Sequence, residues 1–166
     1  EMSPQALAKL DAYMRFGGTI LFDTRDQPSG GFSVGGVGQG TQILRRILGR
    51  LDVPPLVPVG DGHILTKAFY LLDDFPGRWT GGQVWVENVT GGANDGVSSL
   101  IIGAHDWAAA WALGDDGWPL AVVEPGGDRQ REMAFRFGIN LVMYMMTGNY
   151  KADQVHLPTI MERLGE

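Results

Sequence analysis

The chain of 166 residues contains no cysteine. This absence excludes disulfide bonds, cysteine-ligated zinc, iron–sulfur clusters and a thiol nucleophile. Histidine is scarce as well, and His63, His105 and His156 show none of the short spacings typical of a metal site. We therefore expect no metal and no cofactor. A cysteine-free domain functions on either side of a membrane, so the redox compartment stays open.

An excess of positive charge is also missing, because 13 Lys and Arg face 19 Asp and Glu, for a net charge of −6. Without a basic stripe, a domain has little with which to bind nucleic acid or an anionic membrane surface. The most apolar window, Phe137–Met146, is too short to span a bilayer and contains Asn140. We expect no nucleic-acid partner and no direct membrane insertion by this chain.

Glycine, in contrast, is abundant, with 25 residues, several of them in the segment GGFSVGGVGQG. Within it, Gly31–Gly35 matches the G-x-S-x-G pattern of a hydrolase elbow, and Ser33, Asp106 and His156 follow the order of a triad. An elbow needs a strand directly before the serine, but Gln27–Gly30 precedes it here. The segment also lacks the Lys-Ser/Thr of a P-loop. We interpret it as a loop without either chemistry.

Two short apolar runs, Thr19–Phe22 and Val97–Ile102, are typical of strands buried on both faces. Apolar periodicity, caps and glycine stops predict helices over residues 3–16, 41–51, 106–113, 128–146 and 158–164. Further extended segments are expected over residues 64–72, 83–87 and 119–123. The alternation predicts one α/β domain over residues 1–166, a three-layer, mostly parallel sheet with helices on both faces.

Polar side chains follow both apolar runs, at the point where each strand should end. In open parallel sheets, ligands bind beyond the carboxyl ends of the strands. If the two strands are neighbours, these side chains share one crevice and supply carboxylates, a guanidinium for an anionic ligand and an imidazole. The candidate ligand-binding residues are Asp23, Arg25, Asp26, His105, Asp106 and Trp107.

A structural interpretation of the same residues stands beside this one. Asp106 is well placed to cap the helix that begins at Trp107, because aspartate side chains accept the free amides of a helix start. Asp23 and Asp26 could be turn residues, with Arg25 as their ion-pair partner on the surface. In that case none of them carries out chemistry, and we assign no catalytic residue.

Four segments together resemble a family of bacterial proteins: GGTILFDTRDQ, LTKAFYLLDDFPGRW, DGVSSLIIGAHDWAAAWA and REMAFRFGINLVMYMMTGNYKADQVHLP. The chain is similar to members of the domain-of-unknown-function family 4159. The resemblance implies a class I glutamine-amidotransferase-like (flavodoxin-like) domain. It also implies a position near the C-terminus of a membrane-anchored protein. Because no strand precedes the first helix, we expect a fragment that lacks N-terminal strands of the parent domain.

The resemblance brings no activity with it. Amidotransferases of this fold use a cysteine nucleophile, which this chain does not have. Our leading hypothesis is a non-catalytic ligand-binding or interaction domain of a bacterial protein, attached to the membrane through its parent on an undetermined side. Its partner would be a small ligand or another protein. One alternative is a hydrolase or metal-assisted enzyme using Asp23, Asp26, His105 and Asp106, and another is a structural assembly module.

Overall fold

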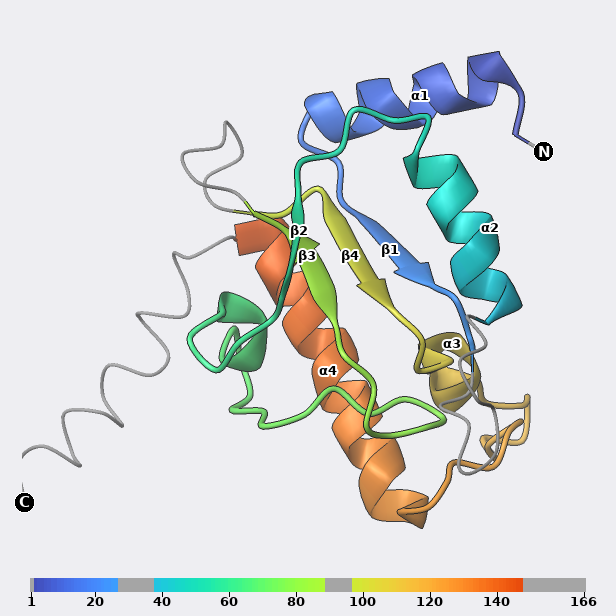
Figure 1. The fold of residues 1–166 in the computed structure, drawn as a ribbon. Helices are drawn as coiled ribbons and strands as arrows, with labels where there is room; N and C mark the ends of the chain where they lie inside the picture. Colours follow the sequence, from blue (N-terminus) through green and yellow to red (C-terminus); the bar gives the residue numbers. More distant parts are fainter. Residues whose placement is uncertain (1, 27–37, 89–96, 148–166) are drawn as a thin grey trace, which may run out of the picture.

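The computed structural model describes residues 2–26, 38–88 and 97–147, and its centre is a four-stranded sheet (Figure 1). The strands are β1 (Ile20–Asp23), β2 (Leu56–Pro58), β3 (Trp85–Glu87) and β4 (Leu100–Gly103), in the spatial order β1-β4-β3-β2. β1 runs parallel to β4, whereas β3 runs antiparallel to both of its neighbours. The described sheet is therefore mixed, and the expectation of a mostly parallel sheet is wrong for it. The connection from β3 to β4, residues 88–99, is at the lower limit of about a dozen residues for a crossover between parallel strands, whereas an antiparallel pair needs no crossover.

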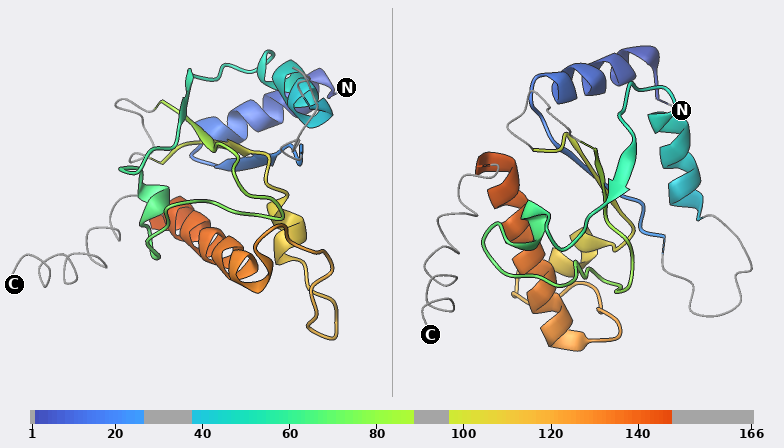
Figure 2. Two further views of the ribbon diagram at one scale, coloured as in Figure 1. Left: turned by 60° about the horizontal axis from the view of Figure 1, so that its bottom comes forward. Right: turned by 60° about the vertical axis from the view of Figure 1, so that its left-hand side comes forward.

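Helices cover both faces of the sheet and make three layers, as expected (Figure 2). On one face lie α1 (Pro4–Arg15) and α2 (Gln39–Leu48). On the other lie the short 3-10 helix η1 (Ile64–Thr66), α3 (Trp107–Trp111) and the long α4 (Gly127–Thr147). Ser3 caps α1, as its sequence position predicted, and its hydroxyl accepts the amide of Ala6 at 3.1 Å.

The side chains of β1 and β4 alternate between the two helical layers. Toward α2, both strands contribute to a small cluster around Leu44, made with Ile20, Phe22, Leu100 and Ile102. Toward α4, Leu21 and Ile101 join the larger core. Both strands are thus apolar on both faces, which is why their composition alone identified them.

Asn140 is a fully buried polar side chain in α4, and it determines the path of the segment after β2. Its carbonyl oxygen accepts the amides of Phe69 and Tyr70, at 3.1 and 2.7 Å. Its amide group donates to the carbonyls of Leu65 and Tyr70, both at 2.8 Å. The prediction that residues 64–72 are extended is wrong, because these bonds fold the segment back against α4. Only η1 is regular there.

Of the remaining predicted elements, one is reduced in the structure and others lie on residues that it does not describe. The predicted edge strand over 119–123 is reduced to one antiparallel bridge between Leu113 and Pro119. Ser33, His156 and the predicted helix over 158–164 lie outside the described residues. Within residues 2–26, 38–88 and 97–147, none of the helices has the length and apolar content that crossing a bilayer requires.

Candidate functional site

The ends of β1 and β4 lie side by side, so the two polar segments that follow them meet. Asp23 pairs with Gly103 in the parallel register, and the amide of Thr24 donates to the carbonyl of Gly103 at 2.9 Å. The two strands are therefore neighbours, which is the condition for their polar side chains to share one site. What each side chain does there is decided by its hydrogen bonds.

Asp23 is turned inward, onto the start of α3. One carboxylate oxygen accepts the amide of Asp106 at 3.1 Å, and the other accepts the amide of Trp107 at 2.7 Å. The first oxygen also accepts the amide of Arg25 at 3.2 Å. The carboxylate that satisfies the first amides of α3 thus comes from the neighbouring strand.

The prediction that Asp106 caps α3 through its own side chain is wrong. Asp106 occupies the cap position, but its backbone is left-handed, with φ of 53°, and its carboxylate makes no capping hydrogen bond. Its carboxylate instead lies 3.5 Å from the guanidinium of Arg78. A left-handed conformation is uncommon for a residue other than glycine, although aspartate tolerates it better than most.

Asp26 is turned inward as well and caps α2. Its two carboxylate oxygens accept the amides of Gly40 and Thr41, at 3.0 and 2.7 Å, and the Thr41 hydroxyl at 2.7 Å. Burial opposes the ionisation of Asp26, but these hydrogen bonds outweigh it and lower the pKa of the carboxyl below its ordinary value of 3.8. Both helix starts that face the strand ends therefore hold a carboxylate of the chain itself.

His105 is fully buried beneath the strand ends. Its Nδ1 accepts the amide of Ala104 at 3.3 Å, so Nε2 carries the proton and donates to the carbonyl of Gly82 at 3.0 Å. The ring stacks on Trp107 with centroids 4.6 Å apart. Burial lowers the pKa of His105 below 6.5, although the Gly82 carbonyl and the charges of Asp74 and Asp23 favour the protonated form. Both ring nitrogens are thus engaged in a neutral imidazole.

Two glycines make the room that the His105 ring occupies. A Cβ on Gly82 would lie 2.7 Å from Nε2 of the ring, and one on Gly103 would lie 2.9 Å from Nδ1. Gly103 also sits against Trp107, whose Cη2 would be 2.2 Å from such a Cβ. Trp107 itself is 0% exposed and donates its indole N–H to the carbonyl of Phe75 at 3.0 Å. Trp107 is therefore part of the core.

Arg78 is the residue at this site that sequence reasoning missed. Besides facing Asp106, its Nε donates to the carbonyl of Val122 at 3.2 Å, and its guanidinium lies 4.5 Å from the ring centroid of Trp79. Arg78 lies in a Pro-Gly-Arg-Trp segment whose sequence indicates only a turn. A buried Asp106 indicates that a cation should be near, but not which of the 13 basic residues supplies it.

Arg25 remains at the surface. Its side chain is exposed, and no hydrogen bond or ion pair joins it to the described part of the chain, so the expected ion pair with Asp23 or Asp26 is not seen there. Its backbone is left-handed, with φ of 55°, as at Asp106. A further donor without a partner belongs to Trp79, the residue after Arg78, because its Nε1 is buried without a hydrogen-bond partner among the described residues.

Carboxylate and histidine side chains do not converge into a metal site at the strand ends or elsewhere in residues 2–26, 38–88 and 97–147. The arrangement at the strand ends therefore consists of two carboxylates that accept backbone amides, the Asp106–Arg78 ion pair, and the exposed Arg25. Chemically, it can donate hydrogen bonds and positive charge to a ligand.

The fold and this site define a three-layer α/β domain with an open mixed sheet and a polar edge at the carboxyl ends of its parallel strands. The chain belongs to the family described as a domain of unknown function, DUF4159, whose family model matches residues 1–146. This match confirms the resemblance inferred from the four sequence segments. No curated protein matches the chain.

Proposed function

We propose that this domain is a non-catalytic binding domain and that its strand-end edge takes an anionic ligand. One observation carries the proposal: the acidic side chains point into the protein, whereas the basic ones lie at the surface. Asp23 and Asp26 accept backbone amides of α3 and α2. Among the described residues, Arg25 is left as an unpaired charge for a ligand, and Arg78 stays partly exposed although it faces Asp106 at 3.5 Å.

The engagement of the acid–base groups supports a non-catalytic role. A general base must reach the proton that it removes. His105 is fully buried and uses both ring nitrogens, and Asp23 is occupied by three backbone amides. A binding role does not require an accessible general base.

The donors at the edge support an anionic ligand class. Guanidinium groups bind carboxylates and phosphates through paired N–H bonds. The indole N–H of Trp79 adds a buried donor that no described acceptor satisfies, and buried donors are rarely left without an acceptor. We infer a small ligand with two or more negatively charged oxygens.

The family resemblance supports a proposal about the parent protein and its location. From the family resemblance we infer a bacterial origin and a glutamine-amidotransferase-like topology. We also infer that the parent protein is attached to the membrane. Expressing the full-length parent with a tag on this domain and separating membrane from soluble fractions tests the attachment. Recovery in the soluble fraction alone would contradict it.

Binding can be measured by titrating citrate and inorganic phosphate into the protein by calorimetry. We expect citrate to bind, and Arg25→Gln to weaken it by about tenfold, the loss expected for one charge-assisted hydrogen bond. Arg45→Gln is the matched control, because Arg45 is an equally exposed arginine on α2. Equal losses in the two variants, or no heat with either anion at millimolar concentration, would count against the site.

A hydrolase remains the second candidate, and one observation favours it. Arg25 and Asp106, both at strand ends, hold left-handed backbones with φ of 55° and 53°. Such strain is concentrated at functional sites. Chromogenic carboxylic and phosphate esters test this candidate. Turnover by the wild type that is lost in Asp106→Asn would establish an enzyme, and turnover that persists in that variant would not involve this site.

A further inference from the structure

The segment between α3 and α4, residues 113–122, forms a projection that we name the finger (Figure 2, left). It turns back on itself at Gly114–Gly117, with the Gly114 amide donating to the carbonyl of Trp118 at 2.8 Å. Asp116 accepts the amide of Trp118 at 3.0 Å, and Leu113 bridges to Pro119. The finger therefore has a defined hairpin-like shape.

The finger exposes large apolar side chains to solvent. Trp118, Leu120 and Val122 are 72, 70 and 69% exposed. They lie within five residues of one another, in a segment that bends at residues 120 and 121. Asp115 and Asp116 are exposed beside them. Large exposed apolar groups in one patch mark interaction surfaces, and tryptophan is the residue that most often dominates such surfaces.

Hydrogen bonds to α3, to the residue that follows it and to α4 also hold the finger in place. Arg131 donates to the carbonyls of Ala110 and Ala121, the former at 2.6 Å. The Leu120 amide donates to the carbonyl of Ala112 at 3.0 Å. A surface that is ordered before binding loses less entropy when its partner arrives. The exposed side chains are thus presented on a pre-formed support.

A groove with the opposite character lies between α1 and α2. It is a hollow of about 490 Å³, lined by Met2, Leu7, Ile43, Arg46, Ile47 and Arg50. Its floor is apolar, and among the described residues the charged ones that line it are two arginines. The Arg46 side chain has no hydrogen bond or ion pair within the described part of the chain, and Ile43 is exposed although it belongs to a helix that packs on the sheet.

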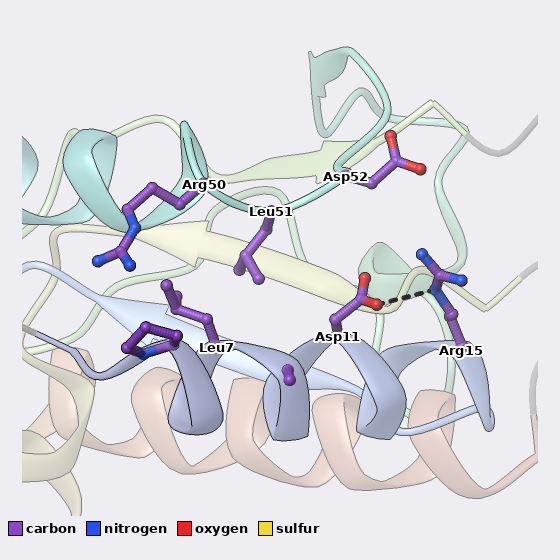
Figure 3. Close-up of a pocket in the computed structure, with 8 residues that line it drawn as sticks. Leu7, Asp11, Arg15, Arg50, Leu51 and Asp52 are labelled. Atoms are coloured by element: carbon purple, nitrogen blue, oxygen red, sulfur yellow. Dashed lines mark ion pairs between the residues drawn. The ribbon is translucent and has the colours of Figure 1, made fainter.

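The groove continues into a second hollow of about 420 Å³, which shares Leu7 and Arg50 with the first (Figure 3). Arg50 stands at one end of it, and the ion pair of Arg15 with Asp11, at 3.0 Å, stands at the other. Leu7 and Leu51 face each other across the space between them. This second hollow is more polar than the first, because Asp11, Arg15 and Asp52 also line it. The apolar floor with its two arginines is thus the part at the α2 end, where Arg50 also donates to the carbonyl of Met2 at 3.0 Å.

The finger and the groove match in chemistry and lie on opposite sides of the molecule. The finger carries apolar side chains flanked by two aspartates, and the groove has an apolar floor flanked by two arginines. The helices α1 and α2 lie beyond one face of the sheet, whereas the finger projects beyond the other (Figure 2). A finger therefore cannot reach the groove of its own chain.

We propose that the finger of one copy of this domain binds the α1–α2 groove of a second copy, with Trp118 in the apolar floor and Asp115 and Asp116 against Arg46 and Arg50. The contact is head-to-tail, so it generates a ring or a filament instead of a closed pair. A hollow of this size is within the range of about 300–1,000 Å³ that holds drug-sized ligands, which is ample for an indole ring. The proposal goes beyond the binding role of the strand ends and uses none of their carboxylates.

The negative charge of the finger favours binding to a second copy of the chain over binding to an anionic bilayer. Tryptophan and leucine on a projecting loop also suit a membrane interface. Asp115 and Asp116, however, would face anionic headgroups at close range, whereas in the groove they meet guanidinium groups. Co-sedimentation with vesicles of phosphatidylglycerol gives the other outcome of the test. Binding to vesicles that Trp118→Ser abolishes, without self-association, would overturn the proposal.

The direct test is analytical ultracentrifugation of the purified protein over rising concentration. We expect the weight-average mass to rise, and 0.5 M salt to weaken the association. Trp118→Ser and Arg46→Glu should each raise the dissociation constant by about tenfold or more. Arg45→Glu, on the same helix but outside the groove, should not. A wild type that stays monomeric at millimolar concentration would overturn the proposal, as would an equal effect of the control.

Mixing the two defective variants makes the test specific. The Trp118→Ser variant has a defective finger and an intact groove. The Arg46→Glu variant has an intact finger and a defective groove. An equimolar mixture should form a one-to-one dimer and nothing larger, because only one productive contact is left. A mixture that stays monomeric, or that assembles beyond a dimer, contradicts the head-to-tail contact. Citrate binding by the monomeric Trp118→Ser variant reports on the strand-end site separately, so either proposal can fail alone.

Discussion

The carboxylate of Asp23 accepts the backbone amide of Trp107 at 2.7 Å, although 84 positions separate the two residues in the sequence. The bond joins the end of β1 to the start of α3, and the same carboxylate accepts the amide of Asp106 at 3.1 Å. An acid at the carboxyl end of a strand is usually the first candidate for chemistry. Here it serves the backbone instead, and Asp26 does the same for α2. This arrangement leaves the arginines to define what the edge can bind.

Replacing Asp23 with alanine should therefore destabilise the protein. The amides of Asp106 and Trp107 would lose their acceptor, and loss of such a cap costs up to about 2 kcal/mol. Asp106→Asn should cost only about 0.5 kcal/mol, because it removes an ion pair with a partly exposed arginine and keeps a residue that tolerates the left-handed backbone. Urea unfolding followed by circular dichroism measures both. Equal losses would mean that Asp23 is not the effective cap.

Gly103 should not tolerate a side chain. A Cβ there would lie 2.2 Å from Cη2 of Trp107, a ring that is buried on all sides and cannot move away. We expect Gly103→Ala to lower the free energy of unfolding by about 3 kcal/mol, the upper part of the range for overpacking a core. Gly62→Ala is the matched control, since nothing lies within 4 Å of a Cβ at that position. It should be neutral or stabilising by up to about 1 kcal/mol.

Asn140→Ala should be among the most damaging single changes. It leaves two amides and two carbonyls of residues 65–70, one of them fully and the others partly buried, without their partner. Each buried group left unsatisfied costs about 1 kcal/mol or more, so a loss of at least about 3 kcal/mol is expected. Amide hydrogen exchange should locate the effect, with Phe69 and Tyr70 losing protection first. Unchanged exchange at these two amides would show that another contact holds the segment.

The sequence predicted those parts of the fold that depend on local composition. Thr19–Phe22 and Val97–Ile102 were expected as buried strands, and β1 and β4 occupy Ile20–Asp23 and Leu100–Gly103. The long apolar helix was expected over residues 128–146, and α4 spans Gly127–Thr147. For the strands, short apolar runs that are buried on both faces left few alternatives, and for the helix the length of its apolar pattern did so.

The parts that the sequence did not predict depend on contacts between distant residues. The local pattern indicated Asp106 as the cap of α3, but the carboxylate of Asp23 reaches those amides from the adjacent strand. Residues 64–72 have an extended pattern, but Asn140 on α4 bonds their backbone into a loop. Arg78 has no local signal at all, because its role depends on Asp106 and on the carbonyl of Val122.

The two described histidines should make the protein less stable as the pH falls below about 6.5. Burial lowers the pKa of both His63 and His105 below 6.5 in the folded protein. In the unfolded chain both take up a proton near 6.5, so between the two pKa values the unfolded state holds more protons. The free energy of unfolding must then decrease with decreasing pH. The lowered pKa of Asp26 acts only below 3.8 and does not contribute in this window.

Urea unfolding at a series of pH values between 7 and 5 measures the effect, and proton NMR of the ring Cε1 resonances assigns it. We expect the His105 resonance to stay at its neutral position while the protein remains folded. His63→Asn should reduce the slope without removing it, because asparagine can still accept the amide of Leu65 that His63 now accepts at 3.1 Å. A His105 resonance that titrates at 6.5 or above would mean that the ring is not held neutral by burial between Gly82 and Trp107.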